Sequence, residues 1–278
     1  MNHFNCNGKI FKEGALVIGP DNRGLRYGDG LFETMKLLNG KIELEDEHFA
    51  RLWKGMQWLQ FDIPKHLHPE TFAAEILLLA KKNEHEKAAR IRLNIFRGDG
   101  GLYDPKNLNP NYIIQSWALP AQNGQWNSNG LVLGCYTDAK KACDCFSNTK
   151  HNNYLPYTMA ALYAKKEKWN DAIVLNQHNR VCDTTIANIF LIKDEKIFTP
   201  ALTEGCVAGI MRSKIIRELK LLGWDVAETE ISLLDVQQAD EIFLSNSIYN
   251  IRWVQSFEKK QYQNSLSIKI FSLLFPTI

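Results

Sequence analysis

The chain has 278 residues, of which 45% are hydrophobic and 23% charged, a composition typical of a globular protein with core enough for one large domain or two modest ones. Its 33 basic and 31 acidic residues are spread along the sequence and leave a formal charge of +2, which argues against a nucleic acid partner. The longest apolar runs are too short to cross a bilayer and the N-terminus lacks the apolar core of a signal peptide, so we expect a cytoplasmic protein that does not enter a membrane.

The first third of the chain predicts a mixture of strands and helices. Asn39-Gly40 is a turn that two-residue β-hairpins favour, and it separates apolar runs at 31–38 and 41–44. Asp46 can cap a helix whose apolar residues recur at helical spacing. The other elements expected here are a strand at 9–12, a glycine-rich bend at 24–30, a helix at 69–82, and strands at 89–97 and 112–118.

A change of composition at residues 119–130 predicts a linker, because this stretch is rich in Pro, Ala, Gln, Asn, Gly and Ser. It would separate a small N-terminal domain, residues 1–118, from a larger C-terminal domain, residues 131–278. No internal repeat is evident, and both domains are expected to be α+β. The elements expected in the second are strands at 131–136, 172–176, 189–192 and 241–245, and helices at 154–168, 209–222 and the C-terminus.

The six cysteines predict neither a disulfide framework nor a metal site. Cys143 and Cys145 are separated by one residue, the other four are scattered, and no pair has the spacing of a zinc finger. His151 nearby does not complete a set of metal ligands. We therefore expect reduced, mostly buried thiols.

Three stretches hold residues that could carry chemistry, and the first surrounds Lys150. This lysine is bracketed by small polar residues and followed by an apolar helix that begins near Tyr154. Most lysines in such positions are simply solvated. A lysine that forms a Schiff base needs desolvation or neighbouring cations that lower its pKa, so that it can attack a carbonyl.

The second and third stretches suggest sites for a ring nitrogen and for an anion. Asp183 lies at the start of a small, hydroxyl-rich loop, where it can be a turn residue or an anion that keeps a heterocyclic nitrogen protonated. In residues 203–212, glycines lead into a helix N-terminus, whose free N–H groups and dipole favour an anion. The spacing of a Walker lysine is lacking, so nucleotide binding fits poorly.

In their order and spacing, these stretches resemble the fold type IV enzymes that depend on pyridoxal 5'-phosphate (PLP). That family holds the branched-chain aminotransferases, the D-amino-acid aminotransferases and the 4-amino-4-deoxychorismate lyases. The resemblance implies a two-domain α+β fold, with a small N-terminal α/β sandwich and a larger C-terminal β-barrel-like domain with flanking helices. The matching segments, which span almost the whole chain, are residues 22–34, 47–52, 97–98, 150–154, 183–188, 199–200, 209–212 and 239–244.

The resemblance also implies roles for single residues. Lys150 matches the lysine that carries PLP as a Schiff base and moves the substrate's α-proton. Asp183 matches the acid paired with the pyridine nitrogen, and Arg51 matches the arginine whose planar fork holds the phosphate. Ile210 and Met211 match helix-start residues whose backbone amides hold the same phosphate.

The resemblance implies two further contacts with the cofactor, and at three positions this sequence differs from the pattern of the family. Ser247 matches a hydroxyl residue that contacts the phosphate, and Tyr154 looks like the tyrosine near the cofactor's 3'-oxygen, one residue closer to the lysine. Asp183 stands where the family usually has Glu, which makes the acid one methylene shorter. Met211 stands where Thr is common, and Asn22 replaces an Asp.

Five residues are candidates for binding the substrate. Arg97 lies where the D-amino-acid enzymes place a carboxylate-binding arginine, and Tyr27 and Phe32 match residues on the substrate side. Arg92 would share a face with Arg97 only if a bulge intervened, because the two positions differ in parity. Arg26 could reach the site of a partner subunit. Surface or interface pairing is the alternative for Arg26 and Arg92, and an arginine on the substrate side would suit an acidic substrate.

The resemblance leaves three functions open. The first is an aminotransferase that moves an amino group between an amino acid and a 2-keto acid. The second is a 4-amino-4-deoxychorismate lyase, which releases pyruvate and 4-aminobenzoate; Lys150-His151 followed by Asn153 looks like the lyases, whereas Tyr154 looks like the branched-chain enzymes. The third is a catalytically silent protein of the same fold. The resemblance also implies a homodimer whose active site lies between the two domains and is roofed by the partner.

Overall fold

The computed structural model describes residues 2–103, 108–120 and 122–276. The chain divides into two compact units. Unit 1 comprises Met1–Asn123 and Thr149–Asn153, and unit 2 comprises Gly124–Asn148 and Tyr154–Ile278. The predicted linker, residues 119–130, includes residue 121, which lies outside the described residues, and the domain boundaries placed at 118 and 131 stay a prediction.

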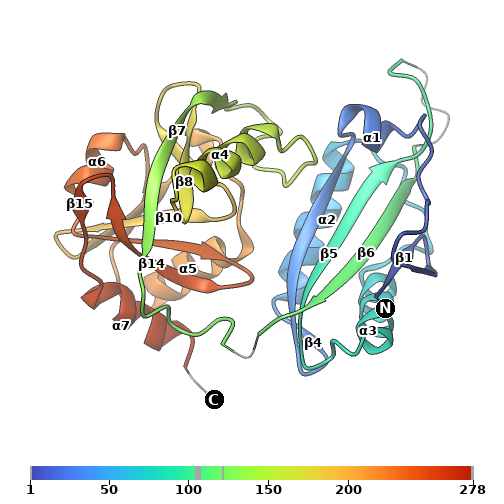
Figure 1. Cartoon of the computed structure of the whole chain (residues 1–278), viewed down its shortest axis with the longest axis horizontal. Coiled ribbons are helices and arrows are strands. Elements are labelled where there is room, and N and C mark those ends of the chain that lie inside the picture. Colours follow the sequence, from blue (N-terminus) through green and yellow to red (C-terminus); the bar gives the residue numbers. More distant parts are fainter. Residues whose placement is uncertain (1, 104–107, 121, 277–278) are drawn as a thin grey trace. The chain divides into compact units, whose positions relative to one another are not determined.

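Unit 1 is built on a six-stranded antiparallel sheet with the strand order β2-β1-β6-β5-β3-β4. The predicted hairpin joins β3 to β4, and both turn residues, Asn39 and Gly40, have positive φ angles (47° and 73°), as a type I′ turn requires. Figure 1 shows β3, β5 and β6 side by side. The strands are β1 (His3–Cys6), β2 (Lys9–Lys12), β3 (Gly30–Leu38), β4 (Lys41–Ile42), β5 (Ala88–Arg97) and β6 (Pro110–Ala118).

Among its described residues, unit 1 contains the helices α1 (Arg23–Tyr27), α2 (Glu45–Trp58) and α3 (Pro69–Lys82). The expected bend at 24–30 contains α1, which ends at Gly28 with a left-handed φ of 64°. The prediction of Asp46 as a helix cap is wrong, because Leu44 is the N-cap residue of α2 and Asp46 lies within the first turn. The helix predicted at 69–82 is confirmed by α3.

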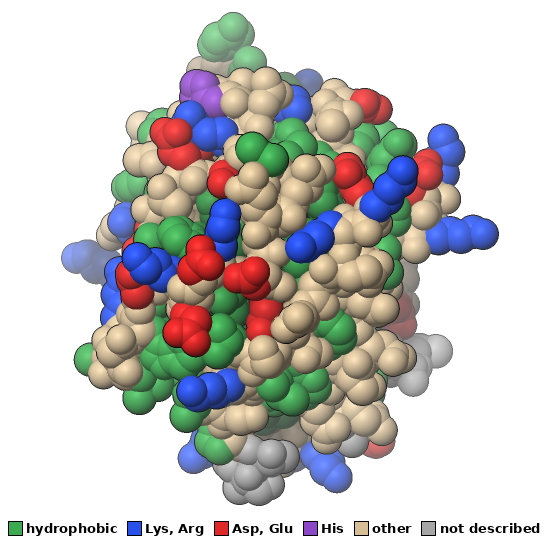
Figure 2. Space-filling view, turned by 90° about the vertical axis from the view of Figure 1, so that its left-hand side faces the viewer, with side chains coloured by type: hydrophobic (Ala, Val, Ile, Leu, Met, Phe, Trp, Pro, Cys, Tyr) green, Lys and Arg blue, Asp and Glu red, His purple; other side chains and the backbone are tan. Residues whose placement is uncertain are grey.

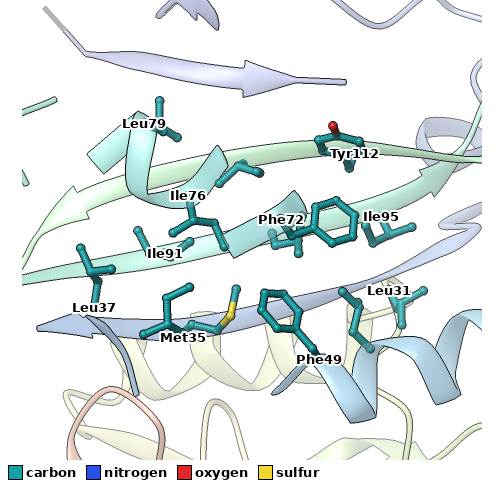
Figure 3. Packing of buried hydrophobic residues seen from close by; sticks show 14 of the residues in the cluster. Leu31, Met35, Leu37, Phe49, Phe72, Ile76, Leu79, Ile91, Ile95 and Tyr112 are labelled. Carbon is teal, nitrogen blue, oxygen red and sulfur yellow. The ribbon is translucent and has the colours of Figure 1, made fainter. Parts of the chain in front are cut away.

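The two faces of the unit 1 sheet differ. Leu31, Met35 and Leu37 of β3 belong to the apolar core that α2 and α3 complete with residues such as Phe49 and Phe72 (Figure 3). Because side chains alternate along a strand, Phe32, Thr34 and Lys36 point to the opposite face. Strand β3 therefore contributes side chains both to the core and to a second face of the sheet.

Unit 2 contains a nine-stranded sheet that curls like a half-barrel, since β9 at one end also contacts β10. Its interior is apolar and is lined by residues such as Leu133, Ile189 and Leu244. The strands are β7 (Leu131–Lys141), β8 (Asp171–Asn176), β9 (Val181–Thr184), β10 (Asn188–Lys193), β11 (Lys196–Pro200), β12 (Val226–Thr229), β13 (Glu241–Asn246), β14 (Asn250–Phe257) and β15 (Lys260–Gln261). The helices are α4 (Leu155–Lys166), the 3₁₀ helix η1 (Leu202–Glu204), α5 (Ile210–Leu221), α6 (Leu233–Gln238) and α7 (Ser265–Leu274).

Surface and cysteine features complete the description. In the face seen in Figure 2, lysine and arginine side chains are interspersed with acidic ones. Among the described residues, no helix is long and apolar enough to cross a membrane. All six cysteines are free thiols, and three of them, Cys6, Cys182 and Cys206, are buried.

Candidate active site

Main-chain hydrogen bonds fix the segment that carries Lys150 against the start of β3. The Phe32 N–H donates to the Lys150 carbonyl at 2.9 Å, and the Asn152 N–H donates to the Gly30 carbonyl at 2.9 Å. Leu31 and His151 form an antiparallel bridge between these two bonds. Residues 149–153 therefore lie beside β3 like a short extra strand, and these backbone bonds hold the Lys150 main chain against β3.

A glycine in the bend before β3 and another at the first position of β3 allow this approach. A Cβ atom on Gly30 would lie 2.1 Å from the Ile95 carbonyl oxygen and 2.6 Å from Asn152 Nδ2. Gly28 has a φ of 64°, and a Cβ atom there would lie 2.4 Å from Asn153 Oδ1. A larger residue at position 30 would clash with the backbone of β5, and one at either position would clash with a side chain of the Lys150 segment.

Three predicted site residues meet on the face of the unit 1 sheet opposite the core. The Nζ atom of Lys150 lies 4.6 Å from the centre of the Phe32 ring, and Cζ of Arg92 lies 3.9 Å from the same ring centre. On this face Phe32 is opposite Asn94 in the neighbouring strand, and the Oδ1 atom of Asn94 is buried without a hydrogen-bond partner among the described residues. The face thus combines two cations, an aromatic ring and a buried acceptor that a ligand could satisfy.

The structure does not bring Arg97 to this group. Strand β5 pairs with β3 and β6 without a bulge, so Arg92 and Arg97 point to opposite faces. Arg97 is 8% exposed, donates to Asp29 Oδ1 at 2.7 Å and to the Leu59 carbonyl, and covers the Phe61 ring. Its guanidinium is occupied inside unit 1.

Two other substrate candidates lie at α1. Arg26 pairs with Asp21 at 3.6 Å, with a side chain that is 43% exposed, and its Cζ lies 5.2 Å from the centre of the Tyr27 ring. Arg26 is exposed, and Tyr27 is half-buried.

Arg51 belongs to a buried charged cluster on the core side of β3. Its Nε donates to Glu33 Oε1 at 2.8 Å and one terminal nitrogen donates to Oε2 at 2.6 Å, while His48 Nδ1 lies 2.7 Å from the same Oε2. Burial alone would raise the pKa of Glu33, but the charges and hydrogen bonds of Arg51 and His48 outweigh it and lower that pKa to about 2. The carboxylate is therefore ionised and accepts from both neighbours.

Asp183 is the centre of the polar cluster in unit 2. The sequence predicted a loop here, which is wrong, because Asp183 lies in β9 and pairs with Val174 of β8. Its carboxylate is 2% exposed and accepts from Tyr157 Oη at 2.7 Å, Asn188 Nδ2 at 2.8 Å and the Val207 N–H at 2.9 Å.

A buried lysine accompanies this carboxylate. Lys141 is 6% exposed, and its Nζ lies 3.4 Å from Asp183 Oδ2. Burial raises the pKa of Asp183, whereas Lys141 and the hydrogen bond from Tyr157 act in the opposite direction. A carboxylate held this way suits a protonated ring nitrogen, because its position is fixed before a ligand arrives.

Tyr154 and Tyr157 lie together at the start of α4. Their rings stack with centres 4.2 Å apart, and Tyr157, rather than Tyr154, donates to Asp183. Burial and the nearby Asp183 raise the pKa of Tyr157 well above its ordinary value, so the phenol stays neutral and remains a donor. Tyr157 was missed from the sequence, although it lies three residues after Tyr154 on the same helix face.

The N-terminus of α5 has the features that favour a bound anion. Gly209 is its N-cap residue, no side chain caps it, and no acidic residue lies in the first turn. The N–H groups of Ile210 and Met211, which begin the helix, have no partner within it. A Cβ atom on Gly209 would lie 1.9 Å from Asn188 Oδ1, so glycine is needed at this junction.

A second observation points to a ligand near this helix start. Ser245 of β13 is 1% exposed, and its Oγ has no hydrogen-bond partner among the described residues. Ser245 pairs directly with Asn188, so both side chains leave the sheet on the face that packs against the start of α5. The sequence analysis did not single out Ser245. Ser247, which it did predict, lies half-buried in the turn after β13, and its role stays a prediction.

These residues fit the cofactor that the resemblance implies. The α5 N-terminus with the unpaired Ser245 hydroxyl suits a phosphate, the fixed Asp183 carboxylate suits a protonated pyridine nitrogen, and Lys150 supplies an amine. The first two features belong to unit 2, and Lys150 belongs to unit 1.

Known proteins resemble this chain in sequence and in fold. Residues 30–257 match the family described as "Amino-transferase class IV". The chain is 32% identical to an aminodeoxychorismate lyase of Vibrio harveyi over 83% of each chain, and 26% identical to a D-alanine aminotransferase of Listeria innocua over 88% of this chain and 84% of that one. Its fold is similar to that of the branched-chain aminotransferase of Thermoproteus uzoniensis, with a TM-score of 0.87, 20% identity, and coverage of 98% of this chain and 93% of the other. The chain belongs to the class IV aminotransferase family, whose members include both aminotransferases and aminodeoxychorismate lyases.

Proposed function

We propose that this protein is a PLP enzyme in which Lys150 holds the cofactor covalently through Nζ. The observation that carries the proposal is the placement of Lys150, which backbone bonds to β3 hold beside Phe32 and Arg92. When bound, PLP would withdraw electrons from the substrate carbon that bears the amino group. The substrate's amine would first displace Lys150 from the cofactor, and the freed Nζ amine would then take the proton from that carbon and return it elsewhere.

The remaining residues would hold the cofactor in place. Arg51, the N–H groups of Ile210 and Met211, and the Ser247 hydroxyl would bind the phosphate. We add the Ser245 hydroxyl to this set, because it is buried and lacks a partner.

The ring end of the cofactor would be held by the Asp183 cluster. Asp183 would keep the pyridine nitrogen protonated, and Tyr157 and Lys141 would fix that carboxylate. Tyr154, stacked on Tyr157, stays our candidate for the contact with the 3'-oxygen.

For the reaction, we propose a 4-amino-4-deoxychorismate lyase. The similarity to the V. harveyi lyase supports this choice, as does the Lys150-His151 pair followed by Asn153. The substrate would lose its enolpyruvyl group as pyruvate and leave 4-aminobenzoate, so no second substrate is needed. Arg92, beside Lys150 and Phe32, is our candidate for binding a substrate carboxylate.

An aminotransferase is the second candidate. The similarity to the L. innocua enzyme and the position of Tyr154 support it. It would need a keto acid as a second substrate, and Arg92 would then bind the carboxylate of an acidic amino or keto acid.

We also propose a homodimer formed through unit 1. Large apolar side chains are exposed on the segment before α1, on α1 and on the loop after β5: Leu16 (99% exposed), Leu25 (67%), Leu102 (56%) and Tyr103 (96%). Arg23 of α1 donates to the carbonyls of Gly101 and Leu102, so α1 and this loop lie side by side. An exposed apolar surface of this kind is typical of a subunit interface.

One assay separates the functions. Purified protein is mixed with 4-amino-4-deoxychorismate, and pyruvate and 4-aminobenzoate are measured; the same protein is then tested with L- and D-amino acids plus 2-oxoglutarate or pyruvate. Equal amounts of pyruvate and 4-aminobenzoate would support the lyase. Keto acid production from an amino acid without the lyase reaction would support the aminotransferase, and neither activity in PLP-loaded protein would support the silent alternative.

A further inference from the structure

Strand β3 carries two neighbouring residues that serve opposite faces of the sheet. Phe32 lies beside Lys150 and Arg92, whereas Glu33 points into the core side and meets Arg51 and His48. Adjacent residues of β3 therefore contact Lys150 on one face of the sheet and Arg51 on the other.

The hold on Arg51 is directional. Glu33 binds it through both carboxylate oxygens, using Nε and one terminal nitrogen, so the plane and the direction of the guanidinium are fixed. The Arg51 side chain is 16% exposed, whereas Glu33 is 1% exposed, so the arginine reaches the surface of the cluster and the carboxylate lies beneath it.

His48 restrains the same carboxylate by a further hydrogen bond. It is fully buried, and its Nδ1 lies 2.7 Å from Glu33 Oε2. Because the ionised carboxylate can only accept, Nδ1 carries the hydrogen. This bond restrains the carboxylate that restrains Arg51.

Stability alone does not account for such a cluster. The neighbours of Glu33 on the same face of β3, Leu31 and Met35, belong to the apolar core, so Glu33 is a buried charge between apolar side chains. Buried ion pairs commonly stabilise a fold no better than apolar residues of similar volume. A buried acid that fixes one partly exposed arginine indicates selection for the position of that arginine.

We propose that Glu33 is a positioning residue for phosphate binding: it holds Arg51, with His48 behind it, in the orientation that receives the phosphate of the cofactor. The proposal rests on the proposed function of Arg51. It assigns Glu33 no contact with the cofactor, and it predicts that loss of Glu33 weakens binding of the phosphate group specifically.

The test compares ligands that differ only in the phosphate. Pyridoxamine 5'-phosphate and pyridoxamine, neither of which reacts with a lysine, are titrated into the full chain freed of cofactor, and tryptophan fluorescence reports binding. The dissociation constant of pyridoxamine divided by that of pyridoxamine 5'-phosphate measures the contribution of the phosphate to binding. A lower value of this ratio means a smaller contribution. Variants are Glu33→Gln, Glu33→Asp and Arg51→Gln, with Glu75→Gln as the control, because Glu75 is a half-buried acid of the same unit that accepts from Asn5 and Tyr112.

We expect Glu33→Gln to lower this ratio by about tenfold, Arg51→Gln by about a hundredfold, and Glu75→Gln not at all. If Glu33 had only a structural role, the Glu33 variants would bind both ligands more weakly by the same factor, and the ratio would not change. If Glu33→Gln does not fold, Glu33→Asp keeps the charge but moves the guanidinium, and it should lower the ratio as well.

The outcomes separate this inference from the proposed function. An unchanged ratio in the Glu33 variants, with a lowered ratio in Arg51→Gln, would overturn the positioning role alone. An unchanged ratio in Arg51→Gln would overturn the phosphate role of Arg51 itself.

Discussion

Asp183 shows how a single buried charge can be prepared for a ligand. Oδ1 accepts from Asn188, while Oδ2 accepts from Tyr157 and the Val207 N–H and lies near the Lys141 ammonium. An isolated carboxylate so deeply buried would be strongly destabilising, and these donors offset that cost. The shorter acid, where the family usually has Glu, is therefore held by four partners from four parts of unit 2.

Replacing this carboxylate should impair chemistry more than binding. Asp183→Asn should still bind PLP, because Lys150 and the phosphate contacts remain, but it should slow proton removal from the substrate tens- to thousands-fold, a loss on the order of 2–4 kcal/mol. Single-turnover rates with a reactive amino substrate measure this step. Asp171→Asn is the matched control, since Asp171 is also buried in unit 2 but accepts from Thr185. An unchanged rate in Asp183→Asn would show that the residue is structural.

At the scale of elements, the start of α5 depends on its contact with β10. The N-cap Gly209 lies against Asn188, whose amide also donates to Asp183 and to the Val207 carbonyl. One side chain thus connects the anion site of the helix with the buried acid. The glycines before this helix were recognised in the sequence, but the contact with β10 was not, because it joins residues from two distant segments.

Adding a methyl group at this junction should disturb both features. Gly209→Ala would place Cβ 1.9 Å from Asn188 Oδ1, so the Asn188 side chain must leave its hydrogen bonds to Asp183 and Val207, or the strand or helix must shift. We expect a loss of about 1–3 kcal/mol in the free energy of unfolding, together with weaker PLP binding. Urea unfolding and PLP titration measure the two effects. Gly19→Ala, where the new Cβ meets nothing within 4 Å, is the control, and equal behaviour of the two variants would refute the close contact.

The strongly patterned elements of the chain were predictable. The hairpin around Asn39-Gly40, the helix at 69–82 and the alternating strand near 89–97 agree with β3–β4, α3 and β5, because each has a clear local period or turn. Strand β9, with its polar residues and only four positions, has no such pattern. Strand β7 continues to Lys141, five residues beyond the predicted end. The prediction stopped early because a stretch with two lysines is typical of a solvent-exposed segment.

The candidate site was predictable only where family resemblance or local sequence could reveal it. Lys150, Arg51 and Asp183 were found through the resemblance. Lys141 and Glu33 were not, because their roles depend on partners that are distant in sequence and on burial of a charge, which is rare enough that a sequence alone argues against it. For Arg97, the resemblance predicted a role in binding the substrate's carboxylate. In the structure its guanidinium instead contacts Asp29 and Phe61 within unit 1.

The proposed homodimer is a property of the whole molecule. We expect a sedimenting mass of twice the 31.9 kDa of one chain. Leu25→Glu should shift the protein toward the monomer, because a charge buried in an apolar interface costs several kcal/mol. Leu78→Glu, on an exposed position of α3, is the control and should stay dimeric. A wild-type monomer that is fully active at low concentration would contradict the proposal.

The central claim, that Lys150 holds PLP, has a direct measurement. The PLP-loaded protein is reduced with borohydride, which fixes the cofactor to the lysine that binds it, and the modified peptide is identified by mass spectrometry. We predict one pyridoxyl group per chain, located on Lys150, and none on the Lys150→Ala variant, which should also lose the yellow absorbance of the bound cofactor. A pyridoxyl group on another lysine, or a Lys150→Ala variant that stays yellow and active, would contradict the account.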